Sequence, residues 1–279
     1  MSSLLKGAVQ AVYSSNLIPI PPEFLAKPPD QTPASRPLRF AEHGFTEYDG
    51  KVAFVIDNVL SHPECKQLIQ LAEESVPRPD SEASWKPAMV ALGKTGWEVP
   101  APGYRESDRI IWDEQKIADR IFARCLLAKG VRVQLQSTPP VNGYRHGRWD
   151  LVELNKRLRF YKYSKNQFFK PHTDLPFGQE RDGKEFRTHY TLYLYLNDSI
   201  AESSANTLDL IGGATAFISR DRKRKLNVSP KVGSVLIFQH HGLRHEESAV
   251  TSGTKYTMRG DILYEWVPGE IQERVSRPV

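Results

Sequence analysis

Apolar residues recur at helical spacing in two segments of the first half of the chain. The first segment, residues 61–75, follows a strand-like run at residues 51–57 and begins with Ser61 as its expected N-cap. The second segment, residues 111–130, has the stronger helical periodicity and is expected to end at Gly130. The pattern therefore predicts a helical layer in this half.

The second half of the chain changes to the pattern of β-strands. Five runs of β-branched and aromatic residues are separated by turn residues, without a helical period between them. The predicted strands span residues 157–163, 188–198, 213–219, 233–239 and 254–266. The sequence therefore predicts an α+β, mainly β fold, with a jelly roll or barrel behind the N-terminal helices.

Prolines set the N-terminal segment apart from the rest. Residues 1–44 contain seven prolines at a spacing that no helix can cross, so an extended arm or a partly disordered lead-in is expected. The expected domain covers residues 45–270, with helical support over residues 45–135 and a jelly-roll core over about 150–267. Residues 271–279 are expected to form a C-terminal tail.

Composition narrows the class of protein without selecting a function. Hydrophobic residues make up 39% and charged residues 25% of the chain, as in ordinary globular domains. The net charge of +5 favours an anionic ligand or partner but does not require nucleic acid. Cys65 and Cys125 lie at expected apolar helix positions, so both are expected to be buried thiols rather than a disulfide or metal ligands.

The N-terminus, the apolar runs and the one basic run indicate which partners and which location to expect. Lys6 interrupts the apolar residues of the N-terminus, and no run approaches the about 20 apolar residues of a membrane span, so no membrane partner is expected. A cytoplasmic or nuclear location follows as the expectation. The basic run at residues 219–227 is interpreted as a solvated hairpin tip, with nucleic-acid binding through residues 223–225 as the less favoured alternative. The sequence sets no oligomeric state.

One histidine and one acid stand two residues apart after the first predicted strand of the β-rich half. His172 and Asp174 would point to the same face if this segment is extended. Two histidines and one carboxylate on one face of iron form the facial triad of non-haem Fe(II) oxygenases. A third ligand would have to come from His240, His241 or His245, which follow another strand. Composition does not choose among these three, and a polar turn is the alternative for each.

Five motifs follow one another in the β-rich half, and together they are more specific than any one alone. They are Tyr163 followed by FFKPHTD, YLND at 195–198, GGAT at 212–215, PKVGSVLIF at 230–238, and His245 with Val250 and Lys255 five and ten residues on. In this order they resemble the Fe(II)- and 2-oxoglutarate-dependent dioxygenases of the prolyl 4-hydroxylase type. The resemblance extends to residues 104–125 and covers roughly residues 50–267.

The resemblance implies a double-stranded β-helix (jelly roll) that holds iron. His172, Asp174 and His245 would be both the metal ligands and the catalytic centre for Fe(II). The cosubstrates would be 2-oxoglutarate and O2, and ascorbate would be the reductant. In this family, decarboxylation of 2-oxoglutarate to succinate is coupled to hydroxylation of an unactivated C–H bond.

The resemblance also implies which residues bind 2-oxoglutarate. Lys255 would pair with its distal carboxylate, because an ammonium neutralises a carboxylate that has been removed from water. Arg259 lies on the same strand face and is the alternative anchor. Thr257, Tyr163 and Tyr195 would add hydroxyl hydrogen bonds to the cosubstrate. The tyrosines expected only to fill the barrel are Tyr161 and Tyr193.

The substrate is expected to be selected by loops around the site. The expected rim segments are residues 77–103, which are read as a long loop, residues 136–148 and residues 175–187. Their aromatic and basic residues are Trp85, Trp97, Tyr144, Arg145, His146, Arg148 and Arg181. This composition suits a peptide substrate, including a prolyl residue, and equally a free amino acid or another small metabolite. A catalytically silent binding module with this fold is the alternative from another class.

Overall fold

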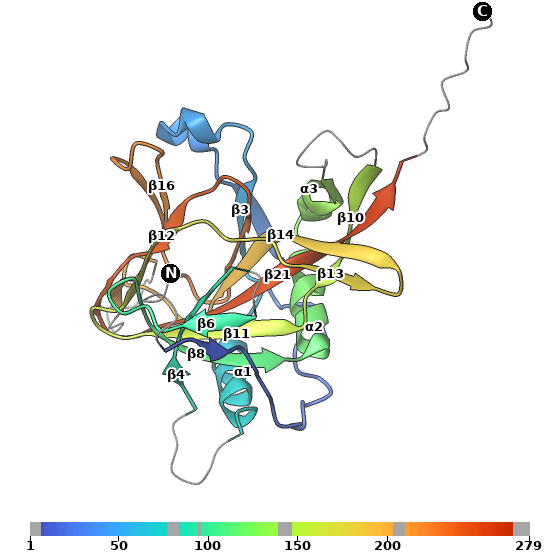
Figure 1. The fold of residues 1–279 in the computed structure, drawn as a ribbon, viewed down its shortest axis with the longest axis vertical. Helices are drawn as coiled ribbons and strands as arrows, with labels where there is room; N and C mark the ends of the chain where they lie inside the picture. The colour runs from blue at the N-terminus through green and yellow to red at the C-terminus, as the bar shows by residue number, and fades with distance from the viewer. Residues whose placement is uncertain (1–6, 78–83, 94–95, 139–146, 203–209, 270–279) are drawn as a thin grey trace, which may run out of the picture.

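The fold was analysed in a computed structural model that describes residues 7–77, 84–93, 96–138, 147–202 and 210–269. Two β-sheets face each other, and helices cover the outer face of the larger one (Figure 1). The mainly β class expected from the strand pattern is confirmed. Among the described residues, no helix combines the length and the apolar sequence that a membrane span requires.

In the described part of the chain, the larger sheet contains 11 strands and runs through the centre of the fold. In spatial order its strands are β2 (Ala34–Pro37), β3 (Ala53–Asp57), β18 (Val235–Gln239), β14 (Lys184–Tyr195), β21 (Lys255–Pro268), β11 (Arg157–Tyr163), β8 (Asp108–Asp113) and β4 (Lys86–Pro87). Three further strands attach to this path, namely β9 (Ser137–Thr138), β10 (Gly147–Leu154) and β13 (Gly178–Arg181). The segment expected to give helical support therefore also contributes strands to this sheet.

The smaller sheet closes the jelly roll. In spatial order its strands are β17 (Lys225–Val228), β16 (Thr215–Ile218), β19 (His245–Glu247), β12 (Phe168–His172) and β7 (Arg105–Glu106). Two small sheets complete the structure, one of β1 (Val9–Gln10), β6 (Trp97–Val99) and β5 (Val90–Ala91), and one of β15 (Ile211–Gly212) and β20 (Val250–Ser252). The basic run forms the tip of the β16–β17 hairpin, as expected.

Alternating side chains of the central strand β14 fill two cores. Leu192 and Leu194 belong to the core beneath α1 (His62–Glu74) and α2 (Gln115–Cys125), whereas Tyr193 and Tyr195 belong to the core between the sheets. In that second core, Phe217 of the smaller sheet meets Phe238 of the larger one with 5.5 Å between ring centroids. A strand that is buried on both faces explains the continuous apolar run in its sequence.

The second helix is shorter than the sequence predicted. Residues 111–113 belong to strand β8, because Ile110 and Trp112 alternate with their neighbours and pack into the core as strand residues. Glu114 caps the helix by accepting a hydrogen bond from the Lys116 amide, and the helix ends at Cys125. Gly130 instead precedes a short helix, α3 (Val131–Leu135).

Strand signals were also missed. Residues 77–103 are not one loop, because the described part contains β4, β5 and β6. Strands β10, β12 and β17 were not predicted either; β12 carries Pro171, a residue that argues against a strand interior. The first helix, in contrast, begins as predicted, with Ser61 and Glu64 forming a capping box. Cys65 and Cys125 are free and buried, also as predicted.

The described part of the proline-rich arm lies on the domain, largely without a helix, with turns at residues 22–26 and a short 3-10 helix, η1 (Phe40–His43). β2 pairs with β3 at the edge of the larger sheet, and β1 pairs with β6. Two arginines of α2 donate to backbone carbonyls of the arm: Arg120 Nη2 to Pro22 O at 2.7 Å and Arg124 Nε to Lys27 O at 2.9 Å. Prolines leave backbone carbonyls without helical partners, so guanidinium groups can take them as acceptors.

Candidate active site

Pairing between two strands of the smaller sheet brings two histidines together. His172 ends β12, His245 begins β19, and the two residues are direct partners in the antiparallel ladder. Their ring centroids are 4.3 Å apart. Asp174 follows β12 by two residues and returns to the larger sheet, where its Oδ2 accepts a hydrogen bond from Thr191 Oγ1 at 2.5 Å. Three side chains from distant positions therefore face one point.

The distances within this triad suit a metal ion. The ligand atoms of His172, Asp174 and His245 lie within 4.8 Å of one another. Asp174 is 3.8 Å from the Nε2 atom of each histidine, through a different carboxylate oxygen in each case. The Nδ1 atoms lie near backbone carbonyls, of Lys170 for His172 (2.9 Å) and of Leu243 for His245 (3.3 Å). If Nδ1 carries the proton, the Nε2 lone pairs of both rings are available for a metal.

The structure brings only one of the three candidate histidines to the pair. His240 is buried beside Asp261, with its Nε2 3.6 Å from Oδ1, and His241 is exposed. His245 therefore lies where the motif spacing placed it.

The surroundings keep His172 and Asp174 in metal-binding forms. Burial, followed by the proximity of His245, lowers the pKa of His172 to about 3. Burial alone would raise the pKa of Asp174, but the Arg259 guanidinium and the two histidines hold this pKa well below its usual range. Near neutral pH, His172 is therefore a neutral imidazole and Asp174 a carboxylate, the forms that bind Fe(II).

The expected cosubstrate anchor, Lys255, lies fully buried at the start of β21. Its Nζ is 5.4, 5.6 and 5.7 Å from the ring centroids of Tyr163, Tyr193 and Tyr195. Its ammonium already has a carboxylate partner, because it donates to Glu247 Oε2. Burial lowers the pKa of Lys255, and the charge of Glu247 opposes this shift. Glu247 was not expected from the sequence; its one signal is its place two residues after His245, on the same strand.

The alternative anchor, Arg259, is also occupied by acids. Its Nη2 lies 3.2 Å from Asp174 Oδ2 and 2.9 Å from Asp261 Oδ1. Arg259 therefore holds the carboxylate of a triad residue, and its pKa is raised by Asp174 and Asp261 against the effect of burial. An anion from outside would have to share either cation with a protein carboxylate.

The tyrosines are arranged differently from the expectation. Tyr195 donates its hydroxyl to Thr215 Oγ1 at 2.9 Å and does not line the cavity beside the triad. Tyr193 does line the cavity, and its hydroxyl accepts from Thr257 Oγ1 at 3.1 Å. Tyr161 and Tyr163 line it as well, so Tyr161 and Tyr193 do more than fill the barrel. Because side chains alternate along a strand, Tyr193 and Tyr195 lie on the same face of β14. The alternation therefore could not show which of the two tyrosines lines the cavity.

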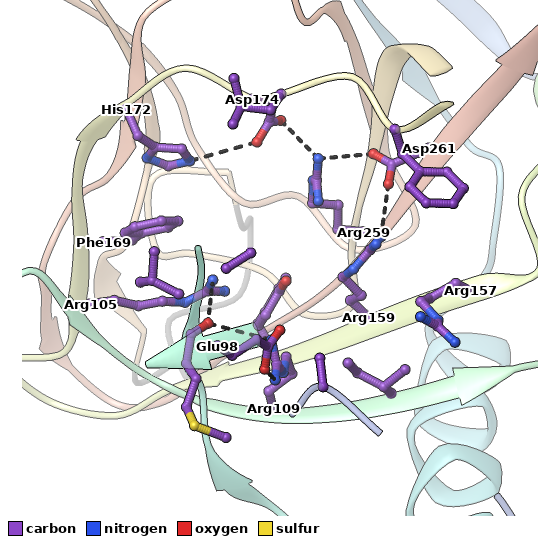
Figure 2. Close-up of a pocket in the computed structure, with 18 of the residues that line it drawn as sticks. Glu98, Arg105, Arg109, Arg157, Arg159, Phe169, His172, Asp174, Arg259 and Asp261 are labelled. Carbon is purple, nitrogen blue, oxygen red and sulfur yellow. Dashed lines mark hydrogen bonds and ion pairs between the residues drawn. The ribbon is translucent and has the colours of Figure 1, made fainter. Parts of the chain in front are cut away.

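A cavity of about 840 Å³ opens beside the triad (Figure 2). Two of the rim segments expected from the sequence line it, through residues 89–91, 93, 96–98, 175–178 and 187. Of the aromatic and basic rim residues named from the sequence, Trp97 is among them. Trp85 instead packs against Tyr256. Arg148 and Arg181 form ion pairs outside it, with Asp150 and Glu153. The remaining rim residues, Tyr144, Arg145 and His146, lie outside the described residues.

The cavity lining is rich in arginine. Six arginines border it, from strands of both sheets, namely Arg105, Arg109, Arg157, Arg159, Arg187 and Arg259. Tyr13 of the N-terminal arm borders the same cavity. Apart from Arg259, these residues were not predicted for the site, because they converge only through sheet register. Arg159 lies opposite Arg259, for example, and Arg109 opposite Tyr161.

The segment of sequence that supplies the triad matches a family model. Residues 158–260 match the model described as the 2OG-Fe(II) oxygenase superfamily. Over this segment the chain is similar to 2OG-Fe(II) oxygenases. The matched segment contains the whole triad together with Lys255 and Arg259. No curated protein sequence matches the chain at a significant level.

Several solved structures align with this chain at low sequence identity. A prolyl hydroxylase of Trichoplax adhaerens, in complex with a hypoxia inducible factor oxygen degradation domain peptide fragment, aligns over 82% of this chain and 89% of its own, with 14% identity and a TM-score of 0.50. A Pseudomonas putida prolyl-4-hydroxylase aligns over 80% and 98%, with 14% identity and a TM-score of 0.46. A viral collagen prolyl hydroxylase of Paramecium Bursaria Chlorella virus-1 aligns over 77% and 97%, with 20% identity and a TM-score of 0.42. The likeness to the first of these shows the double-stranded β-helix fold and leaves the substrate open.

Proposed function

We propose that this protein is a dioxygenase of the prolyl 4-hydroxylase type, which hydroxylates an unactivated C–H bond while 2-oxoglutarate is decarboxylated to succinate. The substrate is a peptide residue, such as a prolyl residue, or a small metabolite. The convergence of His172, Asp174 and His245 within 4.8 Å carries this proposal. Bound Fe(II) would supply the redox chemistry with O2, and ascorbate would keep the metal reduced.

In this proposal the chain's own residues hold the metal and shape its surroundings. His172, Asp174 and His245 bind Fe(II). Backbone carbonyls orient the two imidazoles through their Nδ1 atoms, and Arg259 with Thr191 fixes the carboxylate of Asp174. Such outer contacts keep ligands in place before the metal arrives.

Lys255 is our proposed anchor for the distal carboxylate of 2-oxoglutarate. Lys255 does not itself line the cavity, but its buried Nζ lies near the rings of Tyr163 and Tyr193, which do. In such a buried position an ammonium attracts an anion more strongly than in water. Thr257 follows Lys255 on the same strand face, and Tyr163 borders the cavity above it. Tyr195 can act on the cosubstrate only through Thr215, to which it donates its hydroxyl.

Turnover of 2-oxoglutarate tests the proposal directly. The Fe(II)-loaded protein is expected to form succinate slowly without substrate, and His172→Ala or Asp174→Ala should lower this rate at least about 100-fold, because each removes a ligand of the metal. Anaerobic titration with Fe(II) should show a matching loss of metal affinity.

His241→Ala is the matched control, because this imidazole is exposed and lies outside the triad. It should keep the succinate rate of the wild type within about twofold. Rates near wild type in either triad variant would refute the assignment. Absence of succinate with every form of the protein would favour the silent binding module.

Three further expectations belong to this proposal. The catalytic domain is placed at residues 45–270, between the arm and the tail. A cytoplasmic or nuclear location is consistent with the two free buried thiols. The substrate partner is a peptide or small molecule rather than nucleic acid.

A further inference from the structure

Most of the arginines that line the cavity are neutralised by carboxylates of the protein. Arg109 pairs with Glu98, Arg157 with Asp113, Arg159 with Asp261, and Arg259 with Asp174 and Asp261. Arg187 has no such ion pair, but it also borders a neighbouring surface pocket and so lies at the edge of the cavity. These positions leave one inner arginine without an acid.

That arginine is Arg105, in strand β7. Among the described residues no carboxylate lies within ion-pair distance of it, and its Nε is buried without a hydrogen-bond partner. The acceptors near it are uncharged: the carbonyl of Met89, 3.5 Å from Nη1, and the Tyr161 hydroxyl. A guanidinium that is removed from most of the solvent and has no counter-charge is costly, so a ligand that supplies an anion would relieve this cost.

Two aromatic rings fix the orientation of this guanidinium. Its Cζ is 4.6 Å from the centroid of the Tyr161 ring and 4.4 Å from that of Phe169. Phe169 is the direct partner of Arg105 in the β7–β12 ladder, which explains the stacking. Because aromatic rings contact the faces of the guanidinium, its N–H edge remains for an acceptor in the cavity.

The location of Arg105 relates it to the reaction centre. The Phe169 ring stacks on His172 with 3.8 Å between centroids, and Arg105 lies on the other side of this ring (Figure 2). One aromatic ring thus separates Arg105 from a proposed iron ligand. The surrounding field is positive, because Arg105, Arg259, Arg159 and Arg109 lower the pKa of the buried Tyr161 hydroxyl although burial alone would raise it.

We propose that Arg105 binds a carboxylate of the substrate and thereby places the neighbouring carbon chain beside the triad. The proposal rests on the proposed function and narrows its substrate to carboxylate-bearing molecules. A guanidinium binds a carboxylate through two parallel N–H bonds, which fix both position and direction. The carboxylate can belong to a free organic or amino acid, to a peptide C-terminus, or to an acidic side chain of a peptide.

The test is anaerobic calorimetric titration of the protein loaded with Fe(II) and 2-oxoglutarate. One arm uses N-acetyl amino acids against their carboxamides, a second uses peptides with a free against an amidated C-terminus, and a third uses peptides with Asp or Glu against Asn or Gln. In at least one arm the carboxylate should bind at least about tenfold more tightly than its amide, because its charge is lost in the amide. The arm that shows this preference identifies the source of the carboxylate.

Variants assign the preference to Arg105. Arg105→Gln should remove the preference, and Arg105→Lys should keep only part of it, since an ammonium lacks the two-pronged geometry. Arg157→Gln is the matched control, because this arginine borders the same cavity but is partly exposed and paired with Asp113. It should keep the preference within about twofold.

Three results would overturn the inference. They are equal binding of carboxylates and amides in every arm, a preference that survives in Arg105→Gln, and a loss of 2-oxoglutarate affinity in Arg105→Gln that exceeds the loss of probe affinity. The last would make Arg105 an anchor of the cosubstrate. The comparison of acid and amide uses the wild-type protein, so it does not depend on the folding of a variant. Because the comparison measures binding, it tests the inference even if no succinate forms and the proposed function is wrong.

Discussion

Glu247 forms an ion pair with Lys255 and so competes with 2-oxoglutarate for the proposed anchor. Both side chains are buried, and Glu247 also accepts a hydrogen bond from Thr215 Oγ1 at 3.0 Å. A carboxylate of 2-oxoglutarate that approaches Lys255 would therefore meet a second negative charge at the same ammonium. Like charges at such short range repel, and in a buried site this repulsion is strong. Glu247 should stabilise the protein without cosubstrate and weaken binding of the cosubstrate.

Replacement of the acid by its amide tests this competition. In Glu247→Gln, 2-oxoglutarate should bind about five- to tenfold more tightly, because it becomes the only carboxylate partner of Lys255. Without 2-oxoglutarate the variant should melt at a lower temperature than the wild type, since a buried ammonium has lost its counter-charge. Saturating 2-oxoglutarate should restore much of this loss. Anaerobic calorimetry and thermal melting measure the two effects.

The adjacent acid provides the control. Glu246→Gln removes an ion pair with the partly exposed Lys225 and should change 2-oxoglutarate affinity by less than about twofold. Weaker cosubstrate binding in Glu247→Gln would mean that Glu247 positions Lys255 rather than competing for it. In the same assay, Lys255→Ala should cost more affinity than Arg259→Ala, and the opposite order would move the anchor to Arg259.

At the scale of elements, the backbone of one glycine, Gly233, makes hydrogen bonds both to the end of β14 and to the segment between β3 and α1. Gly233 lies in the turn that leads from β17 into β18, where its amide donates to Tyr195 O at the end of β14 at 2.9 Å. Its carbonyl accepts from the amides of Val59 and Leu60, which lead from β3 into α1. Its φ is +71°, and a Cβ at this position would lie 1.7 Å from Leu60 O. Both the backbone conformation and the close approach require glycine here.

Alanine at position 233 should therefore destabilise the fold strongly. The left-handed conformation costs an alanine roughly 1–2 kcal/mol, and the contact with Leu60 adds a further cost of about 1–3 kcal/mol. Gly50→Ala isolates the first effect, because Gly50 has the same φ of +71° and nothing within 4 Å of its Cβ position. Denaturant unfolding should show a clearly larger loss for Gly233→Ala than for Gly50→Ala. Equal losses would show that the turn moves away from Leu60 at little cost.

At the scale of the whole molecule, the sequence predicted the triad but not its surroundings. His172 and Asp174 are close in sequence, so their own spacing suggested them, whereas His245 was selected from three histidines only by the resemblance to a family motif. Arg105, which no carboxylate of the described residues pairs with, could not be found in this way, since its isolation depends on which arginines the acids of other strands reach. The predicted start of the second helix was wrong for a related reason. Trp112 fits a helical period in the sequence, but it is buried as part of a sheet.

The N-terminal arm forms part of the cavity wall, through Ala11 and Tyr13. Tyr13 donates its hydroxyl to Glu98 and accepts from Arg109 Nη2 at 2.6 Å. Its ring also lies 5.2 Å from the guanidinium of Arg109 and 5.6 Å from that of Arg157. β1 meanwhile pairs with the edge of β6, which carries Glu98. The arm therefore holds a wall that is distant from the triad.

Removal of residues 1–16 should loosen this wall and spare the metal site. Amide hydrogen exchange in β5 and β6 should become at least about tenfold faster, because β6 loses a strand partner and Glu98 loses the Tyr13 hydroxyl. Exchange in β3 and β18 should stay unchanged, and Fe(II) affinity should stay within about twofold, since neither depends on β1. Mass spectrometry of deuterium uptake checks the first expectation, and metal titration the second. Faster exchange throughout the larger sheet would instead make the arm a support of the whole core, whereas unchanged exchange in β6 would show that the wall stands without it.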